Sequence, residues 1–148
     1  MHLAQYPEHQ AFLRAHPDRI PDAVEELLRA YSIVTMRRTV TRDVQIGEAL
    51  MKKGDFVMIA TPSANLDAEV FPNPGEIDFD REDKRHMAFS LGPHRCAGAH
   101  LARRELAIAI EMWLTRVPPF SIKDEDKIVM RAAGVYGLDE LNLQWGKS

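Results

Sequence analysis

The stretch FSLGPHRCAG, residues 89–98, contains the only cysteine of the chain, Cys96, and leads into a long pattern of apolar and polar residues typical of a helix. A cysteine just before a helix lies near the partial positive charge and the unpaired amide hydrogens of its N-terminus, which favour the thiolate over the thiol. Gly92 and Gly98 would let the backbone approach a bulky, flat partner, and Phe89 could shield the sulfur from water. The stretch therefore predicts an anionic sulfur ligand; the alternative is a small buried cysteine beside turn glycines.

The composition predicts one folded domain over residues 1–148. Hydrophobic residues make up 45% of the chain and charged residues 28%, which is ordinary for a globular protein. The net charge of -3 argues against a protein that coats nucleic acid. No apolar run approaches the roughly 20 residues of a membrane span, and a single cysteine cannot form an internal disulfide. We therefore expect no membrane or nucleic-acid partner, and a reducing, cytoplasmic location.

Three segments have the periodicity of helices, at residues 7–15, 20–31 and 97–117. Each of the first two has a proline near its start, which suits the first turn of a helix. The third ends at Pro118-Pro119. It places on one face the apolar residues Ala102, Leu106, Ala109, Ile110, Trp113 and Val117.

Strands are expected elsewhere, so the predicted fold class is α+β. Residues 32–60 are rich in β-branched residues, with turns at Gly47 and Gly54. Residues 61–85 are rich in Pro, Asp and Asn, which predicts a long loop with at most one helical turn, near residues 67–70. Two further strand candidates cover residues 128–131 and 141–145.

The cysteine stretch resembles the haem-binding loop of the cytochrome P450 haem-thiolate monooxygenases, Phe-x-x-Gly-x-x-x-Cys-x-Gly. The match is carried by Phe89, Gly92, His94, Cys96 and Gly98. Three other stretches resemble the same family: EELLR (25–29) its K helix, residues 65–81 its meander, and HLARRE (100–105) the start of its L helix. The resemblance is to soluble bacterial members of the camphor-hydroxylating kind. It implies the C-terminal part of the P450 fold: K helix, small β-sheets, meander, cysteine-ligand loop and long L helix.

The resemblance also implies roles for individual residues. Cys96 would be the proximal ligand of the iron of haem b. Glu26, Arg29 and Arg81 would form a buried ion-pair triad, where an isolated helix would offer only a weak surface pair. Arg38 and His94 would hold the haem propionates, although either could be a solvated basic side chain. Met36 stands where close relatives can carry an acid, which alters the propionate network.

Substrate and redox partner are implied in the same way. Val34, Gly134 and Val135 match positions that touch a small hydrophobic, terpenoid-like substrate in camphor-type relatives, and core packing explains them equally well. A basic patch would receive electrons from an acidic ferredoxin, the alternative being a merely solvated helix end. The residues of this patch are Lys84, Arg85, Arg95, Arg103 and Arg104.

A zinc site is the competing interpretation of the same region. Four possible ligands, His86, His94, Cys96 and His100, occur within a short span. Structural zinc sites use two closely spaced ligand pairs, and a lone cysteine with scattered histidines lacks the second pair, so we do not expect zinc.

Two functions remain open at the level of sequence. The Ala/Gly-Gly-x-Asp/Glu-Thr signature of the family's oxygen-activating helix is not found in residues 1–148, so we expect the distal helices to be missing. With the N-terminal part of the fold restored, the chain would serve a monooxygenase that hydroxylates a small hydrophobic substrate using dioxygen. Alone, it would be a truncated, catalytically inactive haem-binding or apo fragment.

Overall fold

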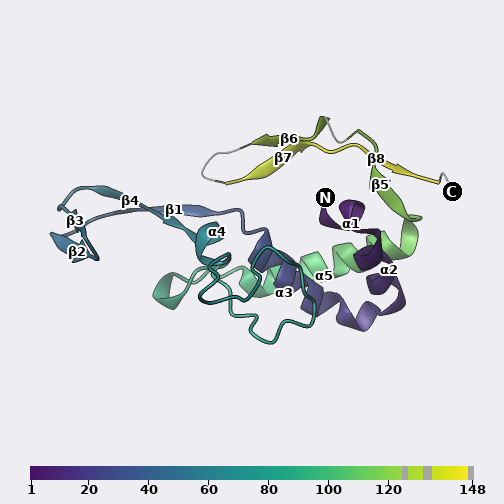
Figure 1. The fold of residues 1–148 in the computed structure, drawn as a ribbon, viewed down its shortest axis with the longest axis horizontal. Helices are drawn as coiled ribbons and strands as arrows, with labels where there is room; N and C mark the ends of the chain where they lie inside the picture. The colour runs from purple at the N-terminus through teal and green to yellow at the C-terminus, as the bar shows by residue number, and fades with distance from the viewer. Residues whose placement is uncertain (125–126, 132–134, 147–148) are drawn as a thin grey trace.

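Two helices, α3 and α5, lie side by side at the centre of the fold, and the other elements are arranged around them (Figure 1). The computed structural model describes residues 1–124, 127–131 and 135–146. Its helices are α1 (His2–Gln5), α2 (Pro7–Ala15), η1 (Pro17–Arg19), α3 (Ile20–Ala30), α4 (Thr61–Ala64), η2 (Gly92–His94) and α5 (Ala99–Arg116). The three predicted long helices are confirmed, each within two residues of its expected bounds.

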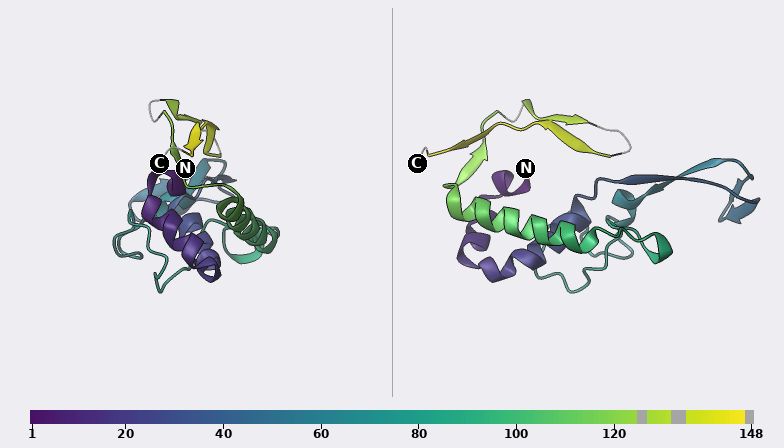
Figure 2. Two further views of the ribbon diagram at one scale, coloured as in Figure 1. Left: turned by 90° about the vertical axis from the view of Figure 1, so that its right-hand side faces the viewer. Right: turned by 180° about the vertical axis from the view of Figure 1, so that it is seen from behind.

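The described strands pair two by two in antiparallel fashion, β1 with β4, β2 with β3, β5 with β8 and β6 with β7. The β1–β4 ribbon and the β2–β3 hairpin extend from one end of the helices, and β6–β7 passes over their other side (Figures 1 and 2). The strands are β1 (Thr35–Thr39), β2 (Val44–Ile46), β3 (Ala49–Met51), β4 (Phe56–Ala60), β5 (Phe120–Ile122), β6 (Val129–Arg131), β7 (Gly137–Glu140) and β8 (Leu143–Trp145).

Sequence patterns missed the strands β5 and β7 and the short helix α4. The strand β7 has the sequence GLDE, whose glycine and acids disfavour strands, so its pairing with β6 overrides local propensity. The short helix of the long loop is α4, which begins at Thr61, and residues 67–70 form a turn instead. The carbonyl of Asp67 closes that turn by accepting the amides of Val70 at 3.1 Å and Phe71 at 2.8 Å, and the Asp67 side chain accepts the amide of Glu69 at 2.9 Å.

The hydrophobic core lies between α2, α3, the end of α5 and the segment around Phe79. Leu13 and Ala23 are fully buried there, and Leu114 anchors α5. The predicted apolar face of α5 is only partly covered, because Leu106 is 39% and Trp113 is 43% exposed. No helix among the described residues has both the length and the apolar character needed to cross a membrane.

Candidate functional site

The loop before α5 is closed by its own backbone and leaves the cysteine accessible. The amide of Cys96 donates to the carbonyl of Phe89 at 2.9 Å, and the amide of Arg95 donates to the carbonyl of Gly92 at 3.1 Å. Gly92 has φ +69°, a conformation that side chains disfavour, which explains a glycine there. Cys96 is exposed, so the alternative of a small buried cysteine is wrong.

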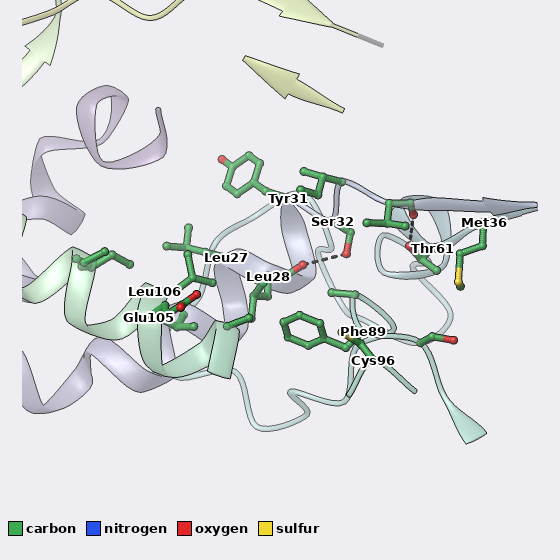
Figure 3. Close-up of a pocket in the computed structure, with 18 of the residues that line it drawn as sticks. Leu27, Leu28, Tyr31, Ser32, Met36, Thr61, Phe89, Cys96, Glu105 and Leu106 are labelled. Atoms are coloured by element: carbon green, nitrogen blue, oxygen red, sulfur yellow. Dashed lines mark hydrogen bonds between the residues drawn. The ribbon is translucent and has the colours of Figure 1, made fainter. Parts of the chain in front are cut away.

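Cys96 and Phe89 line an apolar hollow of about 760 Å³ (Figure 3). This volume falls within the range typical of ligand pockets. Its walls come from α3, the start of β1, the cysteine loop and α5. The apolar side chains that form most of the walls include Val24, Leu27, Leu28, Ile33, Val34, Met36, Leu106 and Ile110.

His94 lines the hollow, whereas Arg38 is not among its lining residues. In the β1–β4 register Arg38 pairs with Val57 and Met36 with Ile59, so Arg38 and Met36 share one face of the ribbon. The Arg38 guanidinium donates to the carbonyl of Arg37 at 2.9 Å. The site thus offers one accessible sulfur, apolar walls and the imidazole of His94, donors that fit an iron porphyrin with its carboxylates.

Glu26, Arg29 and Arg81 meet in a buried cluster behind the hollow. Arg29 grips both oxygens of Glu26 at 2.8 Å, and the Nε of Arg81 lies 3.1 Å from Glu26 Oε1. The side chains of Glu26 and Arg29 are fully buried and that of Arg81 is 9% exposed. Burial works to raise the pKa of Glu26, but the hydrogen bonds from Arg29, the Asp78 amide and Arg81 outweigh it and lower the pKa.

The two arginines also bind the backbone of the loop that follows α4. Arg29 donates to the carbonyls of Asn65 and Pro74 at 2.9 Å and of Glu76 at 3.2 Å. Arg81 donates to the carbonyl of Pro72 at 2.8 Å. The cluster therefore fixes a loop with little regular structure to α3, which forms one wall of the hollow.

Sequence reasoning overlooked Asn65, which is fully buried. Its side chain donates to Ser32 Oγ at 2.5 Å and accepts the amide of Met87 at 2.7 Å. Asn65 thereby connects the end of α3 to the segment that enters the cysteine loop. Its signal in the sequence is weak, because an asparagine in a Pro- and Asp-rich stretch usually indicates only a turn.

The structure brings two of the three expected substrate residues together. Val34 and Val135 form an isolated antiparallel bridge, and the amide of Tyr136 donates to the carbonyl of Ile33 at 2.8 Å. Val34 lines the hollow, whereas Val135 is 52% exposed. Gly134 lies outside the described residues.

The five basic residues differ in their surroundings. Lys84 pairs with Asp22 at 2.6 Å, Arg85 with Asp83 at 2.8 Å, and Arg103 with Glu25 at 2.6 Å. Arg95 and Arg104 are exposed. In the described part of the chain no three His, Cys, Asp or Glu side chains converge as metal ligands would, and His86 faces Glu25 rather than the other zinc candidates.

The sequence model of the cytochrome P450 family matches residues 20–131. Among curated proteins, the chain is 42% identical over 144 residues to the probable cytochrome P450 127A1 of Sinorhizobium fredii, covering 97% of the chain and 35% of the relative. It is 36% identical over 146 residues to the mycinamicin VIII C21 methyl hydroxylase of Micromonospora griseorubida, covering 97% and 38%. The chain thus spans little more than a third of the length of these relatives.

Solved structures show the same likeness. The crystal structure of cytochrome P450 CYP101C1 matches with a TM-score of 0.94 and 37% identity, covering 99% of this chain and 38% of the other. The structure of P450BioI in complex with an acyl carrier protein that carries hexadec-9Z-enoic acid matches with a TM-score of 0.88 and 36% identity, covering 97% and 38%.

Proposed function

The chain belongs to the cytochrome P450 family and has the mixed helix and sheet fold of that family's C-terminal part, and on this premise we propose that it ligates haem b through Cys96 as part of a monooxygenase. The observation that carries the proposal is the exposed Cys96 at the wall of the 760 Å³ apolar hollow. When bound, haem supplies the iron that activates dioxygen, and a thiolate ligand favours cleavage of the O–O bond.

The residues of this chain would bind and orient that group. Cys96 would supply the thiolate that binds the iron, on a loop shaped by Gly92 and Gly98 and flanked by Phe89. His94 and Arg38 would serve as donors to the two propionates; His94 lines the hollow, and Arg38 shares a ribbon face with Met36, which also lines it.

The apolar walls and the buried cluster have complementary roles. With haem bound, the apolar side chains of Leu27, Leu28 and Leu106 would keep water from the space next to the sulfur. The Glu26, Arg29 and Arg81 cluster acts as the structural triad. It fixes the loop after α4 to α3, the helix that forms a wall beside the cysteine loop.

We propose a small hydrophobic, terpenoid-like substrate, contacted by Val34, Gly134 and Val135. The small apolar side chains of the bridge between Val34 and Val135 support this substrate class. Electrons would come from a ferredoxin-type donor on the basic face, where Arg85, Arg95 and Arg104 are exposed.

A second candidate is a chain that binds haem weakly, or not at all, and is inactive when alone. The partly uncovered face of α5, with Leu106 and Trp113, favours this alternative. So does the coverage of the relatives, of which the chain spans 35 to 38%. The partner that restores activity would be the N-terminal part of a P450 fold.

Haem titration followed by spectra of the reduced carbon monoxide complex tests the ligand. The wild-type chain should give the red-shifted Soret band of thiolate coordination, and Cys96→Ala should lose it. His100→Ala is the matched control, because it removes an exposed alternative ligand near the loop and should leave the band unchanged. A band that survives Cys96→Ala would refute the assignment, and oxygenation of a substrate by the chain alone would refute the second candidate.

A further inference from the structure

We propose that Glu25, Arg103 and His86 form a positioning network that holds the ring of Phe89 and thereby fixes the backbone of the Cys96 loop. The contacts of this network are present in the chain without haem. Its consequence for thiolate ligation rests on the proposed function.

Phe89 is enclosed by two side chains that converge on one carboxylate. The Arg103 guanidinium lies 4.8 Å from the centroid of the Phe89 ring, a cation–π distance. The His86 ring lies 6.2 Å from the Phe89 ring at a tilt of 49°. Both Arg103 and His86 face Glu25 of α3, so a single acid holds the two neighbours of Phe89.

The contacts to Glu25 are suited to holding rather than to surface pairing. Arg103 donates to Glu25 through two nitrogens, at 2.6 and 3.0 Å, which fixes the plane of the guanidinium. Nε2 of His86 lies 3.3 Å from the second oxygen of Glu25, and the His86 side chain is only 1% exposed. Nδ1 of His86 accepts the amide of Ala88, and the buried Nε2 faces the carboxylate at a distance and angle outside an ordinary hydrogen bond.

The charge of Glu25 is secure across the physiological range. Burial works to raise the pKa of Glu25, but the facing His86 and the bidentate Arg103 outweigh it and bring the pKa to about 2. The acid therefore stays ionised and keeps its ion pair with Arg103.

The network reaches Cys96 through one backbone hydrogen bond. The carbonyl of Phe89 accepts the amide of Cys96 at 2.9 Å, so fixing Phe89 fixes the start of the turn that presents the sulfur. Arg103 comes from the first turns of α5, the helix that follows the cysteine. The same acid thus ties α3, the loop and α5 together, and Arg103 is committed to this task rather than free for a docking partner.

Amide hydrogen exchange in the 148-residue chain without haem tests the network. Glu25→Gln should speed exchange of the Cys96 amide about tenfold, because losing a charge-assisted pair costs about 1.4 kcal/mol. Arg103→Lys keeps the charge but loses the flat group over Phe89, and about a threefold rise is expected. Asp43→Asn, which removes a paired acid in the distant β2–β3 hairpin region, is the matched control and should change nothing at Cys96.

The Val117 amide, bonded to the carbonyl of Trp113 at the far end of α5, is the internal reference. Equal acceleration of Val117 and Cys96 would mean global destabilisation and would overturn the inference, as would an unprotected Cys96 amide in the wild type. With haem, Glu25→Gln should reduce the share of the carbon monoxide complex that has the thiolate band. If the wild-type chain with haem lacks the thiolate band, the proposed function is wrong. If Glu25→Gln leaves the exchange rate of the Cys96 amide unchanged, the network is wrong.

Discussion

Replacing Arg29 with lysine should destabilise the chain far more than an ordinary arginine-to-lysine change. Arg29 is fully buried and donates five hydrogen bonds, two to Glu26 and one each to the carbonyls of Asn65, Pro74 and Glu76. A lysine ammonium offers three donors at most, so at least two of the five hydrogen bonds are lost, although Arg81 and the Asp78 amide still donate to Glu26. At about 0.5–1.5 kcal/mol of net stability for each lost hydrogen bond, the expected loss is about 1–3 kcal/mol.

Urea unfolding of the chain without haem, followed by circular dichroism, measures that loss. The matched control is Arg19→Lys, because Arg19 pairs with Asp22 and Asp80 near the surface, where its side chain is 28% exposed. Such pairs contribute about 0–1 kcal/mol, so the control should lose less than 1 kcal/mol. If Arg29→Lys also lost less than 1 kcal/mol, the buried cluster would not be what holds the loop to α3.

Two further predictions concern pH and backbone strain. Burial and the neighbouring His9 lower the pKa of His2 from 6.5 to about 4, so its stabilising effect is complete above about pH 6.5 and is lost as the pH falls through 4. Between pH 7 and 4 the free energy of unfolding of the wild type should therefore fall by on the order of 1–2 kcal/mol more than that of His2→Gln, and parallel pH profiles in urea unfolding would contradict this. Gly92→Ala should cost about 1 kcal/mol in the same assay because Gly92 has φ +69°, whereas Gly75→Ala, at an open position without a positive φ, should be nearly neutral; equal effects would contradict the strain argument.

Local patterns predicted the long helices because their causes are local. Pro7 stands at the first position of α2 and Pro21 near the start of α3, and the apolar spacing supplies the rest. The strands β5 and β7 have only three and four residues, and β7 is acidic. Their existence depends on pairing with β8 and β6, which no local pattern of the chain reveals.

For the candidate site, the resemblance named the triad of Glu26, Arg29 and Arg81 but not the backbone partners of its arginines. The resemblance identified Glu26 and Arg29 as an ion pair. The structure adds that Arg29 donates three of its five hydrogen bonds to backbone carbonyls. Backbone carbonyls have no signature in a sequence, since every residue carries one. The sequence also suggested that Arg103 is a surface cation. Its partner Glu25 lies 78 positions away, too far for a local pattern to indicate the pair.

The two consecutive acids of α3 show why the cysteine loop needs a helix behind it. Glu26 faces the loop after α4, through Arg29 and Arg81, and Glu25 faces the cysteine loop, through Arg103 and His86. Neighbouring positions of a helix point about 100° apart, so two adjacent carboxylates can hold two different segments without competing for the same arginine. Both segments lack regular structure over most of their length, so their shape has to come from such long-range anchors rather than from propensity. The next two residues, Leu27 and Leu28, line the hollow together with Cys96. The helix α3 therefore both anchors the cysteine loop and forms a wall of the hollow that Cys96 lines.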